Sequence, residues 1–224
     1  ELVPAMGCTE PIALAYAAAV ARKTLGVLPD KVEVAASGSI IKNVKSVIVP
    51  HTGHLKGIPA AAAAGIVAGD AEKKLEVISY VKEEQVEEIK QFLEQTPITV
   101  EHLESGITFD IVVTVHAGAN SAKVRIANYH TNIVRIEKNG EILENIPVSG
   151  EEENNLTDRS LLDMEHIWEF INTVDIEDVK PILEPQLRMN MTIAEEGMTN
   201  DYGANIGKVI WKTQEHTTAN HARA

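Results

Sequence analysis

The first part of the chain alternates Ala-rich stretches with short apolar runs. Residues 10–24 are apolar on nearly every side, which predicts a helix buried all round. Residues 30–36 alternate apolar and polar positions and predict a strand, and the apolar runs 46–49 and 75–80 are expected to be short strands as well.

Two further helices are predicted in this region. A Gly-rich turn at residues 50–59 opens a second Ala-rich helix, which we expect to extend to about Gly69. Residues 83–95 are charged on one side and carry Val86, Ile89 and Phe92 on the other, which is typical of an amphipathic helix.

From residue 98 the pattern changes to short alternating runs. Asn139-Gly140 is a strong hairpin turn signal and precedes a last short strand at residues 141–143. The other expected strands span residues 98–102, 108–116, 122–128 and 131–137.

The polar run at residues 151–155 is expected to be a linker between two parts of the chain. Beyond it, Ser160 is expected to cap a helix over residues 161–174, and two more helices are expected at 178–195 and 204–215. The sequence therefore predicts an α+β fold, in which a mixed sheet is layered with Ala-rich helices (residues 1–150) and a helical segment follows (151–224).

Composition excludes several classes of function. The chain carries 20 basic and 33 acidic residues, a net charge of −13, which argues against nucleic acid or an anionic membrane surface as the partner. No run approaches the ~20 apolar residues of a membrane span, and there is no basic leader. One cysteine rules out internal disulfides and fits a reducing compartment, so a cytoplasmic location is expected. Both ends look cut, which favours a piece of a longer protein.

Chemistry is suggested first by that cysteine. Cys8 lies in the run Gly-Cys-Thr-Glu-Pro before the first Ala-rich helix, and Thr9 is expected to cap this helix. A thiol at a helix start is expected to have a lowered pKa, which favours the metal-binding or nucleophilic thiolate. The alternative is a small buried hydrophobe.

Three other polar patches interrupt the scaffold. Each has a plain alternative, namely turn geometry, a structural sheet histidine or an exposed interhelical loop. They are Asn43 with the turn that contains Thr52 and Gly53, the run His130-Thr131-Asn132, and the stretch 195–208. There is no CxxC or HExxH metal motif, no Gly-x-Ser-x-Gly elbow and no Walker or Rossmann fingerprint.

Taken together and in this order, the patches resemble the L-cysteine desulfidase family, relatives of the iron–sulfur L-serine dehydratases. The resemblance is carried by residues 7–20, by the segment 42–61 with its Thr52-Gly53 turn, by the block 130–134 and by the stretch 196–207. It covers almost the whole chain, which would correspond to the N-terminal half of such an enzyme.

The resemblance implies a lyase that eliminates sulfide from L-cysteine and yields pyruvate and ammonia. It implies a 4Fe-4S cluster with one open iron, held by three cysteines of which Cys8 would be the first. Glu10 and His130 would be the catalytic residues for proton transfer. Thr9, Asn43, Thr52, Gly53, Thr131 and Asn132 would bind the small amino-acid substrate.

One thiol does not hold such a cluster, so the 224-residue chain alone is expected to contain no iron and to be inactive. A hydro-lyase acting on L-serine or L-threonine and a non-catalytic amino-acid-binding module are the alternatives. We expect Thr9, Glu10, Asn43, Thr52, His130 and Asn132 to converge around Cys8. Unpaired apolar helix faces further predict a homo-oligomer.

Overall fold

The computed structural model describes residues 2–148 and 159–213. The chain divides into two compact units, of which the first is Val3–Asn155 and the second contains the C-terminal helices. The predicted boundary at residue 150 and the predicted linker at 151–155 lie outside the described residues.

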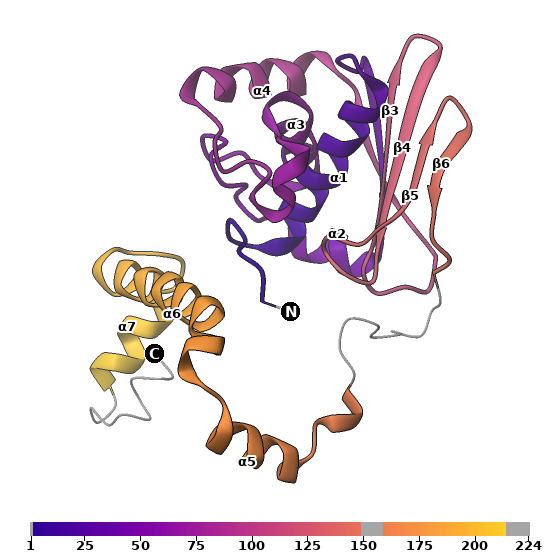
Figure 1. The fold of residues 1–224 in the computed structure, drawn as a ribbon. Coiled ribbons are helices and arrows are strands. Elements are labelled where there is room, and N and C mark those ends of the chain that lie inside the picture. The colour runs from indigo at the N-terminus through magenta and orange to yellow at the C-terminus, as the bar shows by residue number, and fades with distance from the viewer. Residues whose placement is uncertain (1, 149–158, 214–224) are drawn as a thin grey trace. The chain divides into compact units, whose positions relative to one another are not determined.

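The first unit is built on a six-stranded mixed sheet with the order β2-β1-β3-β4-β5-β6. Only β1 and β2 pair in parallel, and every other neighbour is antiparallel. The predicted α+β fold class is confirmed (Figure 1). The strands are β1 (Lys31–Ala36), β2 (Ile98–His102), β3 (Asp110–Ala117), β4 (Asn120–Ala127), β5 (Ile133–Lys138) and β6 (Glu141–Asn145).

Helices cover one face of this sheet. Helix α1 (Thr9–Leu25) lies directly on β3 and β4, α3 (Gly57–Ala68) packs against α1, and α4 (Glu83–Gln95) packs against α3 (Figure 1). Strands β1, β3 and β4 bury alternate residues, such as Val32 and Val34 of β1, against the helices.

Small side chains let the two central helices approach closely. Alanine occupies 6 of the 17 positions of α1 and 6 of the 12 positions of α3, and all of these alanines except Ala68 are buried. At Gly65 of α3, an added Cβ would lie 2.0 Å from the carbonyl oxygen of Ala15 in α1, so only glycine fits this crossing.

Two predicted strands are absent from the fold. Residues 46–49 form only an isolated bridge between Ile48 and Lys56. Residues 75–80 lie in a 3₁₀ helix, η1 (Ala71–Glu76), and in the turns after it, where Leu75, Val77 and Ile78 are buried. A short apolar run shows that a segment is buried but does not fix its backbone conformation.

One helix was not predicted. Helix α2 (Gly38–Val44) follows β1 directly and buries only Ile40 and Val44. With seven residues it offers too few apolar positions for a helical period to stand out. The Asn139-Gly140 hairpin, in contrast, is confirmed, because both residues have positive φ (52° and 84°), as a type I′ turn requires.

The C-terminal unit is helical, as expected, but its first helix starts later than predicted. Helix α5 (Met164–Thr173) is capped by Asp163, which accepts a hydrogen bond from the backbone of His166 at 2.9 Å. Ser160 lies upstream, in η2 (Arg159–Leu161), so it is not the cap. Helices α6 (Ile176–Thr199) and α7 (Ile206–Thr213) follow. None of the helices in the described part of the chain is both long and apolar enough to cross a membrane.

Candidate functional site

The carboxylate of Glu10 is the centre of a polar cluster at the start of α1. It accepts hydrogen bonds from the Cys8 thiol at 3.3 Å and from the Thr9 hydroxyl at 3.4 Å. Thr9 was expected to cap the helix. It is instead the first residue of α1, where Cys8 occupies the cap position without a side-chain cap bond.

A third donor reaches Glu10 from a different helix. Asn43 lies near the end of α2, and its Nδ2 donates to Oε1 of Glu10 at 3.3 Å. The short helix that the sequence pattern did not reveal therefore places a predicted binding residue at the cluster.

His130 approaches Glu10 from the loop between β4 and β5. Its ring packs against Phe109, with 4.4 Å between ring centroids and planes tilted by 54°. Its Nε2 is buried and has no hydrogen-bond partner among the residues that the structure describes. Glu10 and His130 interact electrostatically. We call Cys8, Thr9, Glu10, Asn43 and His130 the Glu10 cluster.

These contacts shift three ionisations. Burial lowers the pKa of His130, an effect that the attraction of Glu10 partly opposes. Burial raises the pKa of Glu10, but its own backbone amide, Cys8, Asn43 and His130 outweigh this, so the pKa of Glu10 is lowered overall. Glu10 is thus ionised and His130 neutral near pH 7.

The thiol differs from the expectation. Burial, together with the hydrogen bond to Glu10 and its charge, raises the pKa of Cys8. Burial and the Glu10 carboxylate together outweigh the helix N-terminus, which by itself would favour the thiolate. Cys8 is nevertheless exposed, so the alternative of a buried hydrophobic cysteine is wrong.

Thr52 and Gly53 lie apart from these hydrogen bonds. Thr52 is fully buried and donates to the carbonyl of Val49 at 2.7 Å, which is a structural role within the turn. Gly53 has a φ of 65° and lies so close to α4 that an added Cβ would be 3.0 Å from Val86. The turn begins near the N-terminal motif, since a Cβ on Gly7 would lie 3.7 Å from Pro50.

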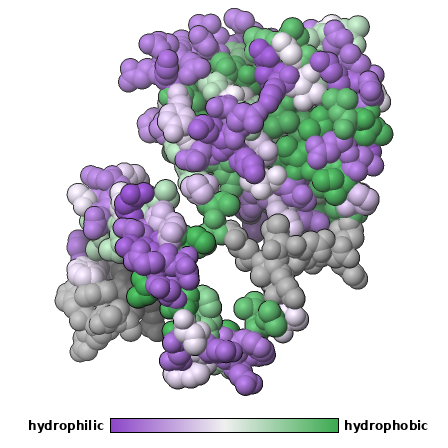
Figure 2. Space-filling view, in the orientation of Figure 1, coloured by the Kyte–Doolittle hydropathy of each residue, from purple (hydrophilic) through white to green (hydrophobic). Residues whose placement is uncertain are grey.

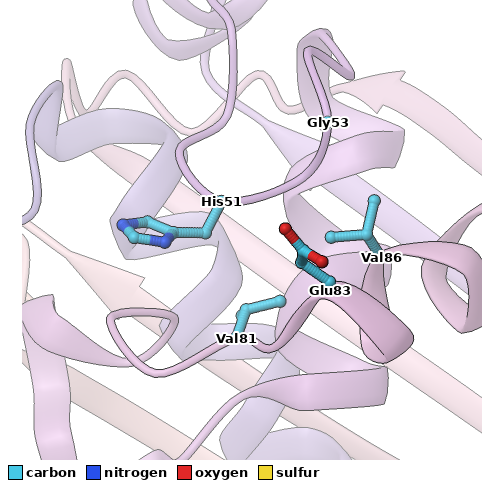
Figure 3. A pocket seen from close by; sticks show the side chains of 5 residues that line it. All are labelled: His51, Gly53, Val81, Glu83 and Val86. Atoms are coloured by element: carbon cyan, nitrogen blue, oxygen red, sulfur yellow. The ribbon is translucent and has the colours of Figure 1, made fainter.

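The same turn borders a cavity of about 350 Å³ at the start of α4. Figure 3 shows the turn that carries His51 and Gly53 beside the first residues of α4, with the Glu83 carboxylate directed toward it. Val81 and Val86 complete the lining. His51 also has positive φ (57°), which is uncommon for a residue with a side chain.

Thr131 and Asn132 shape the loop that presents His130. The Asn132 side chain donates to the carbonyl of Ala127 at 2.9 Å, and its backbone nitrogen donates to Tyr129 at 3.1 Å. The carbonyl of Thr131 accepts from Ile133 at 3.1 Å. The predicted convergence holds only in part: Cys8, Thr9, Asn43 and His130 each interact with Glu10, whereas the recorded bonds of Thr52 and Asn132 go to the backbone.

Sequence reasoning missed Phe109, which supports the His130 ring from the segment before β3. It also missed the buried carboxylate of Asp110, which accepts two hydrogen bonds from Arg125 at 2.9 and 2.7 Å. Both contacts join residues at least 15 positions apart in the sequence, so no local spacing reveals them.

The fourth patch lies in the C-terminal unit and forms an exposed network of its own. Glu196 accepts from the Tyr202 hydroxyl at 2.6 Å and from Asn200 at 2.7 Å, and Lys208 pairs with Asp201 at 2.8 Å. These bonds fix the α6–α7 connection.

The described residues contain no group of three or more His, Cys, Asp or Glu side chains arranged to hold a metal ion. Cys8 supplies one thiol, whereas a 4Fe-4S cluster needs about three or four ligands. The residues of this chain do not by themselves fit such a cluster.

Comparison with known proteins places the chain beside proteins from several organisms. It is 50% identical over 224 residues to a protein of Desulfitobacterium hafniense, which corresponds to all of this chain and 52% of that protein. It is 46% identical over 210 residues to a protein of Lachnoclostridium phytofermentans (94% of this chain, 50% of that protein) and 45% identical over 211 residues to one of Fusobacterium nucleatum (94% and 49%). All three are named UPF0597 proteins.

The chain spans about half the length of these UPF0597 relatives. No protein-family profile matches it. The assignment of this chain to the L-cysteine desulfidase family, as its N-terminal half, is therefore wrong, because similarity along nearly the whole chain leads to proteins that carry the UPF0597 name. Short motifs such as Gly-Cys-Thr-Glu-Pro and a Gly-rich turn are weaker evidence than identity over 224 residues.

Proposed function

We propose that the Glu10 cluster is the acid–base centre of a carbon–sulfur lyase, which eliminates sulfide from L-cysteine to give pyruvate and ammonia. The observation that carries the proposal is the buried Nε2 of His130, which has no hydrogen-bond partner in the described part of the chain and interacts electrostatically with the ionised Glu10. A buried polar atom without a partner is costly unless a ligand completes it.

In this proposal, neutral His130 is the base. Its Nε2 takes the Cα proton of the bound amino acid, and the Glu10 carboxylate stabilises the imidazolium that forms. As the Cα–H electron pair forms the Cα–Cβ double bond, the Cβ–S bond breaks and its pair leaves with sulfur as hydrosulfide. The aminoacrylate tautomerises to an imine, and water converts it to pyruvate and ammonia.

The donor set of the cluster favours sulfide over hydroxide as the leaving group. Hydroxide is a poor leaving group without an acid to protonate it. Around Glu10, the described donors are a thiol of raised pKa, a hydroxyl and an amide, all weak acids. Thr9 and Asn43 are suited to orient an amino acid by hydrogen bonds.

The main alternative within the enzyme class is a hydro-lyase that acts on L-serine or L-threonine. An amino-acid-binding module without turnover is the second alternative, since the cluster would also bind a small zwitterion. We further propose a cytoplasmic location, supported by the single free thiol, which persists best in a reducing compartment.

The test uses the longest natural reading frame that contains this chain, assayed anaerobically for sulfide and pyruvate with L-cysteine, L-serine and L-threonine. We expect turnover of L-cysteine, and a loss of about 100-fold or more in kcat/KM for His130→Asn and for Glu10→Gln. His102→Asn, on the exposed edge strand β2, is the matched control and should stay near wild type. Pyruvate from L-serine alone, binding without turnover, or an active His130→Asn variant would each overturn the proposal.

A further inference from the structure

The C-terminal unit exposes an apolar groove along a single helix. The groove has a volume of about 600 Å³ and runs along one side of α6. Its lining residues are Ile176, Val179, Lys180, Leu183, Glu184, Leu187, Arg188 and Met191. The apolar members recur every three or four residues, so they share one side of the helix.

Nothing in the described part of the unit covers this side. No residue of α5, α6 or α7 is buried, and hydrophobic side chains reach the surface of these helices (Figure 2). Pro181 and Pro185, which interrupt the backbone bonding of α6, fall on the opposite side by the 3.6-residue period. An uncovered apolar face of this kind marks an interface.

The charges beside the groove indicate its occupant. Lys180, Glu184 and Arg188 follow one another at intervals of four residues and alternate in sign. In an antiparallel pair of such helices shifted by one turn, Glu184 of each copy faces Lys180 or Arg188 of the other. In a parallel pair the two rows would lie at opposite edges of the interface and would not face each other. The exposed Lys180–Glu177 pair at 3.2 Å lies within one helix. It competes only weakly with pairing of Lys180 to Glu184 of the other copy.

We propose that the groove is covered by α6 of a second copy of this chain, packed antiparallel. The 24 residues of α6 extend for about 36 Å, which lets the apolar row of one copy lie along that of the other. The row Lys180–Glu184–Arg188 sets the direction and the register of the pair. This assembly is independent of the proposed lyase activity.

Sedimentation of the 224-residue chain at micromolar concentration tests the apolar part. We expect a dimer mass for wild type and for Ile182→Glu, whose side chain is on a different side of α6 and is 58% exposed. Leu183→Glu, at a neighbouring position that is 43% exposed, should give a monomer. A wild-type monomer would overturn the proposal and leave the groove to another polypeptide. The same sedimentation mass for Ile182→Glu and Leu183→Glu would overturn the proposal as well.

Charge variants test the direction of packing. Glu184→Lys makes the row uniformly positive, and we expect the dimer dissociation constant to rise about tenfold, because the change acts twice across the two-fold axis. The triple variant K180E/E184K/R188E inverts every charge but restores the alternation, so it should dimerise like wild type. These exposed positions leave folding intact, which circular dichroism confirms. Loss of dimer in the triple variant, or none in Glu184→Lys, would overturn antiparallel pairing.

Discussion

At the start of α1, one carboxylate controls the ionisation of two chemically different neighbours. Burial raises the pKa of the Cys8 thiol, and Glu10 raises it further by a hydrogen bond and by charge; the same carboxylate opposes the lowering of the His130 pKa by burial. Removing this single charge should therefore move both groups in the same direction, toward lower pKa.

NMR titration of the His130 ring protons checks this coupling. The pKa of His130 should lie below the ordinary value of 6.5. In Glu10→Gln it should fall further, because burial then acts without the opposing attraction. Asp163, in the C-terminal unit, is the internal control: hydrogen bonds from His166 lower its pKa, which should be the same in both proteins. A higher pKa of His130 in the Gln variant would contradict the assignment.

The same shift makes stability depend on pH. Since the folded pKa of His130 is lowered, the unfolded chain binds the proton more readily just below pH 6.5. The contribution of neutral His130 to the free energy of unfolding is complete above that pH. It is lost as the pH falls toward the pKa of His130 in the folded protein.

Part of the site was predictable from local motifs, and part was not. Cys8, Thr9 and Glu10 are neighbours in the sequence, so a functional site at the start of α1 could be predicted from the local motif. The bond from Asn43 depends on the unpredicted α2, and the contact between Phe109 and His130 depends on how β3 and the β4–β5 loop meet. The pKa of Cys8 followed Glu10 instead of the helix dipole, and a sequence pattern does not rank these two effects.

At the scale of elements, the α1–α3 crossing is the tightest contact of the fold. Gly65→Ala would force a Cβ to 2.0 Å from the Ala15 carbonyl, so the helices must separate. We expect a loss of about 3 kcal/mol in the free energy of unfolding, measured by urea denaturation followed by circular dichroism.

Gly197→Ala is the matched control for that change. This glycine lies inside α6 with no atom within 4 Å of an added Cβ, so alanine should stabilise its helix by about 0.5–1 kcal/mol. Equal destabilisation by both substitutions would show that the crossing is looser than described.

Periodicity predicted the elements whose amphipathic pattern is long or alternates strictly. The bounds expected for α4 and β2 are those observed. The errors at residues 46–49 and 75–80 involve runs of only four to six residues, in which burial is clear but a helix, strand or turn buries the apolar side chains equally well.

At the scale of the molecule, the hydrophobic core belongs to one unit. Every member of the buried cluster lies between Met6 and Ile136. Residues 1–148 should therefore fold alone and retain a cooperative thermal transition in circular dichroism. A broad, non-cooperative transition would show that the core needs the C-terminal helices.

The alanines at the centre of this core reverse the usual direction of mutational risk. In most proteins the interior is damaged by truncation, which leaves a cavity. In α1 and α3 eleven of the twenty buried residues are alanines, whose side chains are single methyl groups, so little volume remains to be removed at these positions. Most single-nucleotide changes of an alanine codon encode a bulkier residue. Random mutation of this gene will therefore damage the protein mainly by crowding, and the variants most useful for restoring it will be those that make a neighbouring side chain smaller.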